Sequence, residues 1–289
     1  MKVLILGIDG MIGHKIAQSL SRDFVLFGST RKNITIDSIG LKSCCLVYYD
    51  FLIKDNFSIF EEINPDVIIN CIGITTRRGV SLNTANTKHI NEELPHRINE
   101  WTTENEKKLI HFSTDCVFSG TKGNYLDNDT PNAEDLYGVT KGKGELNNDK
   151  ALTIRCSTIG REIYNHTELF EWLYSMKNKH IEGYSDVIYS GVTTLWMGKV
   201  ILQILKKNIG LSGIYNISSE PISKYHLLLK LSEAFKLNIN ISENSNIKSN
   251  KVLNSKKFTE ITGIKSPNWD DLIPDFKNDC KKYANLYKN

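Results

Sequence analysis

The sequence predicts an α/β fold: a doubly wound parallel sheet with a smaller carboxyl-terminal lobe interleaved with it. Short apolar runs, such as residues 3–6 and 67–69, have the length of buried strands. Patterns typical of helices separate these runs, and a glycine-rich turn follows the first of them. A strand, a tight turn and a helix in succession begin a βαβ unit, so we expect the sheet to start at the amino terminus.

The composition is that of a soluble globular protein. Of 289 residues, 40% are hydrophobic and 24% charged, and 36 basic against 33 acidic residues leave a net charge of +3. No basic tract suggests nucleic acid or a membrane surface as a partner, and the apolar runs are too short to cross a bilayer. The chain begins directly with a strand pattern rather than an export signal, so we expect a cytoplasmic protein.

Cysteine and histidine spacing gives no indication of a metal site. The six cysteines form no zinc-type pairs, and the seven histidines show no ligand spacing such as His-x-x-x-His. We therefore expect reduced, buried thiols and no structural metal.

The first predicted strand, residues 2–7, ends in the pattern G-x-x-G-x-x-G. Such glycines let the backbone approach a pyrophosphate, and the following helix offers it free N–H groups and a positive dipole end. The alternative is a tight turn whose glycines serve packing alone. The residues predicted to bind a cofactor here are Gly7, Asp9, Gly10, Met11, Ile12 and Gly13.

The second predicted strand, residues 24–28, is followed by Ser29, Thr30, Arg31 and Lys32. A dinucleotide-binding fold places the adenosine ribose at this strand end, where an acidic residue would select NAD. Two hydroxyls and two cations suit a 2′-phosphate instead, so the sequence favours NADPH over NADH. The alternative role for the cations is a solvated loop.

The third and fourth predicted strands, residues 45–49 and 67–71, add further cofactor contacts at their ends. We expect Asp50 to reach the adenine amino group and Phe51 to pack beside the ring. The fourth strand ends at Cys71, Ile72 and Gly73.

Residues 74–88 are predicted to form a mobile loop, in which Arg77 and Arg78 either meet an anionic substrate or lie on a plain surface. A helix is predicted over residues 89–104. It contains Asn91, and Pro95 lies near its first turn.

The fifth predicted strand, residues 109–112, leads into a hydroxyl-rich segment that begins with Ser113 and Thr114. Downstream, Tyr137 and Lys141 are four residues apart, so on a helix they share one face. The ammonium would lower the pKa of the phenol from about 10 and make it a usable general acid. A hydroxyl to hold a carbonyl oxygen, a phenol to protonate it and a lysine to tune the phenol are what a carbonyl reduction needs. By itself, Tyr-x-x-x-Lys more often marks a solvated helix face.

These motifs together resemble an extended short-chain dehydrogenase/reductase of the NAD(P)-binding Rossmann type, and most closely the dTDP-4-dehydrorhamnose reductase branch. The resemblance covers nearly the whole chain in order and includes Asn91 to Pro95. It implies that Thr114, Tyr137 and Lys141 are catalytic, that Ser113 lies beside the nicotinamide, and that Asn91, Tyr137 and Lys141 contact the cofactor. The sequence departs from the branch at Cys116, where an aromatic residue is common, and at residues 75–78.

The rest of the chain is predicted to form the substrate lobe. The cofactor domain would comprise residues 1–160 and about 193–218, and the substrate lobe residues 161–192 and 219–289. Arg161 could clamp a diphosphate or serve as a structural ion-pair partner, and Trp172 is a weak candidate for stacking on a base or sugar. Residues 243–250 are expected to be a surface loop, and residues 281–289 a frayed helix end. The predicted substrate contacts are Asp115, Val117, Phe118, Arg161 and Trp172.

The function predicted from the sequence is the NADPH-dependent reduction of the C4 ketone of a nucleotide-linked 6-deoxy-4-ulose, by a monomer or homodimer. The resemblance implies dTDP-4-dehydro-L-rhamnose as the default substrate, with a UDP-linked 2-acetamido-hexos-4-ulose as the nearest alternative. A dehydratase is disfavoured because it needs more acidic residues beside Thr114 than Asp115 alone. A non-catalytic role, like that of the regulatory subunit of methionine adenosyltransferase, stays open.

Overall fold

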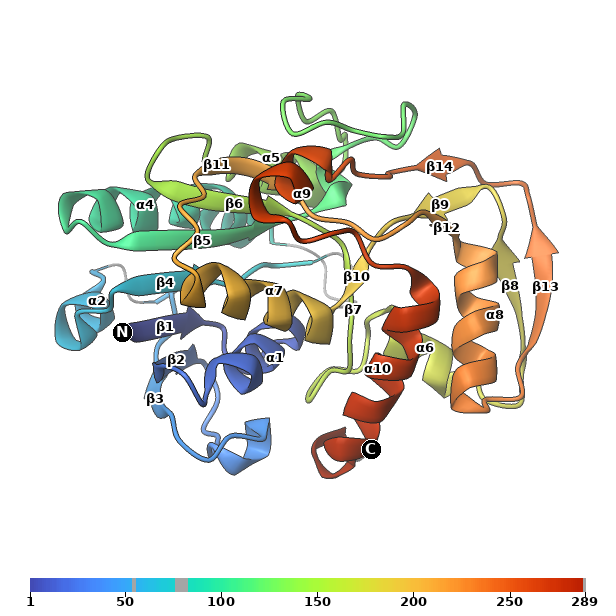
Figure 1. Cartoon of the computed structure of the whole chain (residues 1–289), viewed down its shortest axis with the longest axis horizontal. Helices are drawn as coiled ribbons and strands as arrows, with labels where there is room; N and C mark the ends of the chain where they lie inside the picture. The colour runs from blue at the N-terminus through green and yellow to red at the C-terminus, as the bar shows by residue number, and fades with distance from the viewer. Residues whose placement is uncertain (54–55, 76–82, 288–289) are drawn as a thin grey trace.

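The computed structural model describes residues 1–53, 56–75 and 83–287 (Figure 1). Its centre is a seven-stranded sheet in the order β11-β6-β5-β4-β1-β2-β3, and every neighbouring pair in it is parallel. The sheet confirms the predicted fold class. Its strands are β1 (Lys2–Leu6), β2 (Val25–Thr30), β3 (Cys45–Tyr48), β4 (Val67–Asn70), β5 (Lys108–Ser113), β6 (Ala151–Arg155) and β11 (Gly213–Asn216).

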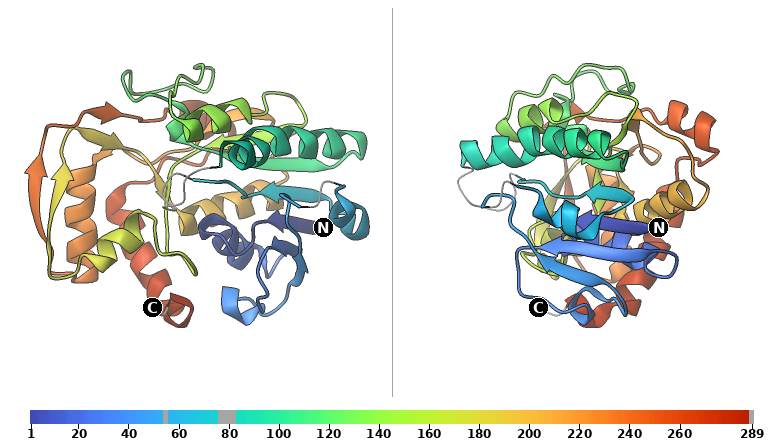
Figure 2. Two further views of the ribbon diagram at one scale, coloured as in Figure 1. Left: turned by 180° about the vertical axis from the view of Figure 1, so that it is seen from behind. Right: turned by 90° about the vertical axis from the view of Figure 1, so that its left-hand side faces the viewer.

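Both faces of the sheet are buried, which explains why its strands are apolar without alternation. Along β1, Val3 and Ile5 belong to one core cluster, while Leu4 and Leu6 belong to another on the opposite face. Helices α1 (Met11–Leu20) and α7 (Thr194–Lys206) pack together on the first face. Helices α2 (Ser58–Ile63) and α4 (Leu94–Glu104) cover the second, and α5 (Leu136–Lys143) lies on the same side as α4 (Figure 2).

The chain reverses direction across the sheet between β1 and β4. From β1 it continues outward to β2 and β3, then returns to β4 and proceeds through β5 and β6 on the other side. In open α/β sheets the crevice at such a switch point, beyond the carboxyl ends of the strands, is where ligands bind. The fold therefore directs attention to the segments that follow β1, β2, β4 and β5.

A second lobe with its own apolar core lies at one end of the sheet (Figure 1). Strand β13 pairs in parallel with β8, and helix α8 packs over both. The elements of this part of the chain are β7 (Thr158–Ile159), α6 (Leu169–Ser175), β8 (His180–Tyr184), β9 (Val187–Tyr189), β10 (Val192–Thr193), β12 (Ile222–Ser223), α8 (Lys224–Phe235), β13 (Asn240–Asn244), β14 (Ser249–Asn250) and α10 (Trp269–Lys282). Helix α9 (Lys256–Thr262) packs instead on β11 of the large sheet.

Two predicted loops contain regular structure. Helix α3 (Thr84–Lys88) and the π-helical segment His89–Glu93 run into α4, so the helical region begins at Thr84, where the Asn83 side chain caps it, rather than at His89. Pro95 lies in the first turn of α4, as predicted. Within the expected surface loop 243–250, the ends of the segment belong to β13 and β14. Arg77 and Arg78 lie outside the described residues.

The carboxyl terminus is the clearest correction. Residues 281–289 were expected to fray, but a 3-10 helix, Ala284–Tyr287, follows α10, and Tyr287 is buried. The cysteines also differ from the expectation, because Cys156 and Cys280 are buried whereas Cys45 is exposed. No helix in the described part of the chain is both long and apolar enough to span a membrane.

Candidate active site

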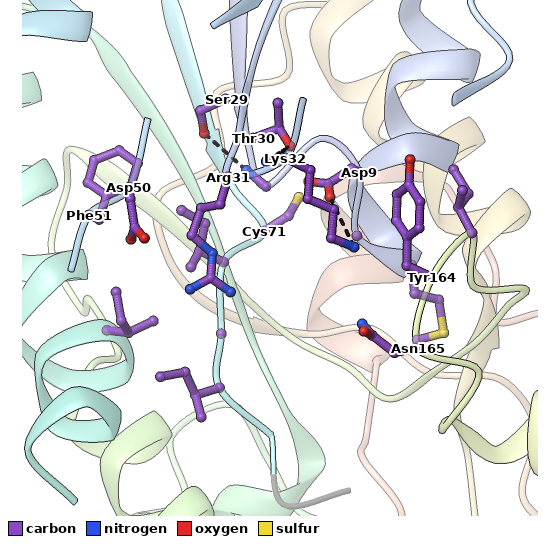
Figure 3. Close-up of a pocket in the computed structure, with 18 of the residues that line it drawn as sticks. Asp9, Ser29, Thr30, Arg31, Lys32, Asp50, Phe51, Cys71, Tyr164 and Asn165 are labelled. Atoms are coloured by element: carbon purple, nitrogen blue, oxygen red, sulfur yellow. Dashed lines mark hydrogen bonds and ion pairs between the residues drawn. The ribbon is translucent and has the colours of Figure 1, made fainter. Parts of the chain in front are cut away.

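A cleft of about 960 Å³ lies beyond the carboxyl ends of β1, β2, β3 and β4 (Figure 3). One wall is formed by the turns after these strands, and the opposite wall by residues 162–165, which follow β7. The predicted cofactor residues that line it are Gly7, Asp9, Gly10, Met11, Ser29, Thr30, Arg31, Asp50, Phe51, Cys71, Ile72 and Gly73.

The glycine turn shows why glycine is needed at two of its positions. Gly7 has a φ of 73°, which disfavours any residue with a Cβ, and its carbonyl accepts a hydrogen bond from Gly10 N at 3.0 Å. A Cβ on Gly13 would lie 2.2 Å from the Gly7 oxygen, so helix α1 packs this closely only without one. Gly13 and Ile12, which packs on the core, shape the turn without lining the cleft.

The cations after β2 lie at the rim of the cleft. Arg31 is exposed and extends into the cleft in Figure 3, with Lys32 beside it. The hydroxyls act on the backbone: Ser29 Oγ accepts from Gly7 N at 3.2 Å, and Thr30 Oγ1 from Lys32 N at 3.1 Å. Lys32 Nζ lies 3.4 Å from the centre of the Tyr164 ring, on the opposite wall. Lys32 Nζ also lies 3.8 Å from Asp9 Oδ2, which offsets part of its charge (Figure 3). Arg31 is therefore the cation that can attract a phosphate, while the hydroxyls hold the turns in shape.

At the strand end where adenine is predicted to bind, Asp50 lines the cleft, but its Oδ1 already accepts from Leu52 N at 2.9 Å. Phe51 also lines the cleft, but it is 3% exposed and its ring centre lies 4.7 Å from that of Tyr49, so the ring belongs mainly to the core.

Asn91, a predicted cofactor contact, is not among the described residues that line the cleft. It is fully buried, and its amide clamps the backbone of Ile74 through both the N–H and the carbonyl, each at 2.9 Å. The same amide nitrogen lies 3.3 Å from Thr140 Oγ1 on α5. Asn91 therefore supports the wall from behind.

The three predicted catalytic side chains converge at the carboxyl end of β5. Thr114 directly follows the strand, and its side chain lies near enough to Tyr137 to lower the pKa of the phenol. Lys141, one turn further along α5, donates to Phe112 O of the same strand at 2.6 Å. Helix α5 is held in register by Asp135, which caps Gly138 N at 2.9 Å. A hydroxyl from the end of β5 and a phenol and an amine from α5 thus lie at one strand end.

The ionisation of this group differs from the sequence-based expectation. Burial raises the pKa of the Tyr137 phenol above its ordinary value, with the nearby Cys116 acting in the same direction and the Thr114 side chain opposing it. Burial also lowers the pKa of Lys141 to about 8, against the raising effect of Glu145. The predicted lowering of the phenol pKa is therefore wrong for this arrangement, in which the Lys141 amine is directed at the Phe112 carbonyl.

Two polar residues that sequence reasoning missed stand behind Lys141. Its Nζ lies 3.5 Å from His111 Nε2, and His111 Nδ1 lies 3.2 Å from Asn70 Nδ2. Asn70 Oδ1 accepts from Ile72 N at 3.1 Å, in the wall of the cleft. The signal available in the sequence was a polar residue within each of two otherwise apolar strands.

Ser113 is turned toward the sheet instead of the cleft. Its hydroxyl donates to Glu145 Oε1 at 2.7 Å, and Glu145 forms a buried ion pair with Arg155 at 2.7 Å. The Ser113 hydroxyl therefore does not point toward the cleft, where the nicotinamide was predicted. The Glu145 carboxylate binds this hydroxyl more strongly than a neutral acceptor would.

The predicted substrate contacts are mostly structural. Val117 and Phe118 are fully buried, and Phe118 stacks on Tyr125 at 4.0 Å. Arg161 is an ion-pair partner of Glu171, bonded at 2.6 and 3.2 Å, and so is not available to clamp a diphosphate. Asp115 accepts from Thr114 Oγ1 at 3.2 Å, and Trp172 is partly exposed on α6; neither lines the cleft as the described residues outline it.

The opposite wall of the cleft was also missed. Residues 162–165 have neither a periodic pattern nor a recognisable motif in the sequence. They line the cleft because the chain passes beside it after β7. Among the described residues, no three His, Cys, Asp or Glu side chains cluster in a way that could hold a metal ion. The cleft residues outside the cofactor prediction are Lys32, Tyr49, Ile74, Ile90, Glu162, Ile163, Tyr164 and Asn165.

Comparison with known proteins gives one family over nearly the whole chain. The family described as RmlD substrate binding domain matches residues 1–281. A dTDP-4-dehydrorhamnose reductase of Aggregatibacter actinomycetemcomitans is 27% identical over 78% of this chain and 76% of its own length. Methionine adenosyltransferase 2 subunit beta of Xenopus tropicalis is 24% identical over 82% of this chain and 72% of its own.

The same fold is found in a solved structure. The dTDP-4-dehydrorhamnose reductase of Bacillus anthracis, solved in complex with NADP, has a TM-score of 0.73 and 18% identity, covering 96% of this chain and 99% of that one. At this level of identity the comparison concerns the fold.

Proposed function

Because the chain belongs to the RmlD substrate binding domain family, we propose that it is an NADPH-dependent oxidoreductase that reduces the C4 ketone of a nucleotide-linked sugar. The observation that carries this proposal is the convergence of Thr114, Tyr137 and Lys141 at the end of β5. None of the three lines the cleft as the described residues outline it, but Lys141 is linked through His111 and Asn70 to Ile72 in its wall. Binding of NADP by the structurally similar Bacillus anthracis reductase supports the choice of cofactor.

The cleft residues fit a dinucleotide. Gly10 begins helix α1 without a side-chain cap, which leaves N–H groups of the first turn for a pyrophosphate. Arg31 supplies the charge that a 2′-phosphate requires. When bound, NADPH supplies a hydride to the ketone carbon of the substrate.

The side chains handle the proton. With its pKa raised by burial, Tyr137 keeps its proton at neutral pH, which is the state a proton donor needs. The phenol transfers this proton to the carbonyl oxygen as the hydride reaches carbon. Thr114 holds that oxygen, and solvent returns a proton to the phenolate after the reaction.

Lys141 provides the charge for this step. Its pKa of about 8 leaves it an ammonium at neutral pH, and it lies one helical turn from Tyr137. A buried ammonium would stabilise the developing phenolate once it turned from the Phe112 carbonyl toward Tyr137, because at 3% exposure solvent screens it little.

We propose dTDP-4-dehydro-L-rhamnose as the substrate, since the Aggregatibacter relative is a dTDP-4-dehydrorhamnose reductase. The experiment is to mix the protein with NADPH and a panel of dTDP- and UDP-linked 4-uloses, including a 2-acetamido sugar, and to follow the absorbance of the reduced nicotinamide. Oxidation with the dTDP sugar alone supports this substrate, whereas oxidation with the UDP sugar alone replaces it.

The role of the phenol is tested with Tyr137→Phe. We expect kcat to fall by about 10³-fold while NADPH binding changes little, because the hydroxyl acts on the proton and not on the cofactor. Loss of NADPH binding together with unchanged turnover per bound cofactor would reject this role.

The second candidate is a non-catalytic binding subunit, which the similarity to methionine adenosyltransferase 2 subunit beta favours. Mixing the purified protein with a purified methionine adenosyltransferase catalytic subunit and measuring the mass of the complex tests it. A complex, combined with no turnover of any 4-ulose, would favour this function over the reductase.

A further inference from the structure

The buried Tyr287, near the carboxyl terminus, contacts one residue behind each wall of the cleft, His14 and Arg161. Tyr287 is 5% exposed and lies at the end of the 3-10 helix that follows α10. Helix α10 stands between the sheet side of the molecule, where it packs on α7, and the outer helix α8 (Figure 1). The tyrosine is thus positioned behind the cleft, where the two parts of the chain meet.

The first contact runs to the glycine turn through His14. The Tyr287 hydroxyl lies 3.0 Å from His14 Nε2, and His14 Nδ1 lies 2.8 Å from Gly10 O. A carbonyl can only accept, so Nδ1 carries the proton, Nε2 is the acceptor, and the tyrosine donates. The imidazole is fully buried, and burial lowers its pKa to about 3, in keeping with this neutral form.

This chain of hydrogen bonds orients a peptide group at the cofactor site. Gly10 O accepts from both the backbone and the side chain of His14, at 3.1 and 2.8 Å. The Gly10 carbonyl and the Met11 N–H belong to one planar, trans peptide group, so they point in opposite directions. Because the carbonyl points along α1, the N–H points out of the start of the helix, where Gly10 and Met11 line the cleft.

The second contact runs to the opposite wall through Arg161. Its Nη2 donates to Tyr287 O at 3.4 Å, and its guanidinium lies 4.8 Å from the centre of the tyrosine ring. Arg161 directly precedes residues 162–165, which form that wall. Glu171 holds both Arg161 and Glu162 N, the latter at 2.8 Å, so the start of this wall is rigid.

A buried ion pair fixes the segment that carries the tyrosine. Lys15 Nζ, next to His14 on α1, lies 2.6 Å from Asp279 Oδ2 of α10, and both side chains are at most 9% exposed. The same amine lies 4.3 Å from the centre of the Tyr283 ring. Breaking a buried pair leaves an uncompensated charge, so the docking of α10 on α1 is strongly specified.

We propose that Tyr287 is a positioning residue that holds the two walls of the cofactor cleft at the spacing NADPH requires. It acts on one wall through His14 and Gly10 and on the other through Arg161. The proposal rests on the proposed function only in taking NADPH as the ligand of the cleft.

The test is calorimetric binding of NADPH to Tyr287→Phe, with Tyr283→Phe as the matched control. Both variants lose one phenolic hydroxyl from the same segment, but only the first loses the bond to His14, whereas Tyr283 contacts Lys15 through its ring. We expect Kd to rise about tenfold in Tyr287→Phe and to stay near the wild-type value in Tyr283→Phe.

Two further readouts separate positioning from general stability. The melting temperature of the cofactor-free protein should be similar in the two variants, and kcat at saturating NADPH should equal that of the wild type. An unchanged Kd in Tyr287→Phe, or an equal rise in both variants, would overturn the proposal while leaving the reductase intact. Failure of the wild-type protein to bind NADPH would overturn both.

Discussion

The two ends of the site are built in different ways. At the cofactor end, the turns after β1 and β2 form an open surface, on which exposed Arg31 faces the cleft. At the catalytic end, Thr114 and Lys141 are 7% and 3% exposed, and their polar atoms bond to other protein groups. The cofactor end is thus a preformed surface, whereas the catalytic end is a closed hydrogen-bond network. To hold a carbonyl oxygen, the Thr114 hydroxyl must first break its hydrogen bond to Asp115.

This difference separates what each kind of mutation should change. Substitutions that alter the backbone of the cofactor end should change the affinity for NADPH, because the backbone turns there form the binding surface. Substitutions in the catalytic network should change turnover, because its members act on charge and protons.

The largest expected effect is at the catalytic end. Lys141→Met keeps the length of the buried chain but removes the charge, so we expect kcat to fall by about 10³-fold while Kd for NADPH changes by less than about fivefold. The matched control is Lys143→Met, since Lys143 is on the same helix with an exposed amine. Steady-state kinetics with calorimetry checks this; a comparable loss in both variants would remove the distinction between the two ends.

The next effect is at the cofactor end. Gly13→Ala places a methyl group 2.2 Å from the Gly7 oxygen, so α1 must move away from the turn, and we expect Kd for NADPH to rise about a hundredfold or more. Gly210→Ala is the control, because a Cβ at Gly210 meets no described atom within 4 Å. Wild-type affinity in Gly13→Ala would show that the turn is not a rigid binding surface.

A smaller effect concerns the buried His14 behind the cofactor end. Its pKa is lowered to about 3, so between pH 6.5 and 3 the unfolded chain binds a proton that the folded chain does not. The folded state therefore incurs no penalty for the buried neutral imidazole above pH 6.5, and its free energy of unfolding decreases as the pH falls below that value. Urea unfolding should show the wild type losing about 2 kcal/mol more than His14→Gln between pH 7 and pH 5. Parallel losses in the two proteins would contradict a buried neutral imidazole.

The smallest effect tests cofactor preference. Arg31→Ala removes an exposed charge at the rim, so we expect the KM for NADPH to rise about tenfold and that for NADH to stay nearly constant. The rise should diminish at high salt, because exposed charges are screened. An equal change for both cofactors would mean that Arg31 does not distinguish a 2′-phosphate.

Local sequence signals predicted the sheet and most of the strand-end residues that line the cleft. Each strand of the sheet is an apolar run bounded by turn residues, and the glycine turn, Arg31 and Asp50 directly follow strands. In a parallel sheet the carboxyl ends of all strands lie at the same edge. A residue that directly follows a strand in the sequence is therefore placed at that edge in space. The same reasoning brought Thr114 to the end of β5.

Direction and burial of side chains were not predictable in this way. Val117 and Phe118 are only three and four residues after Thr114, which made them predicted substrate contacts. In the structure both side chains are fully buried. Arg161 meets Glu171, ten residues away, and Asn91 turns its amide to Ile74. A sequence shows which groups are near in the chain, but not which of two available partners a long side chain binds.

The sequence by itself determined the parallel sheet, the glycine turn and the three groups that meet at β5, because hydrophobic periodicity and strand ends are local properties. Only the tertiary structure decided the ionisation of Tyr137, the wall formed by residues 162–165 and the docking of Tyr287 on His14. These depend on desolvation and on contacts between residues as far as 273 positions apart. No local pattern encodes such contacts; they arise when the whole chain packs.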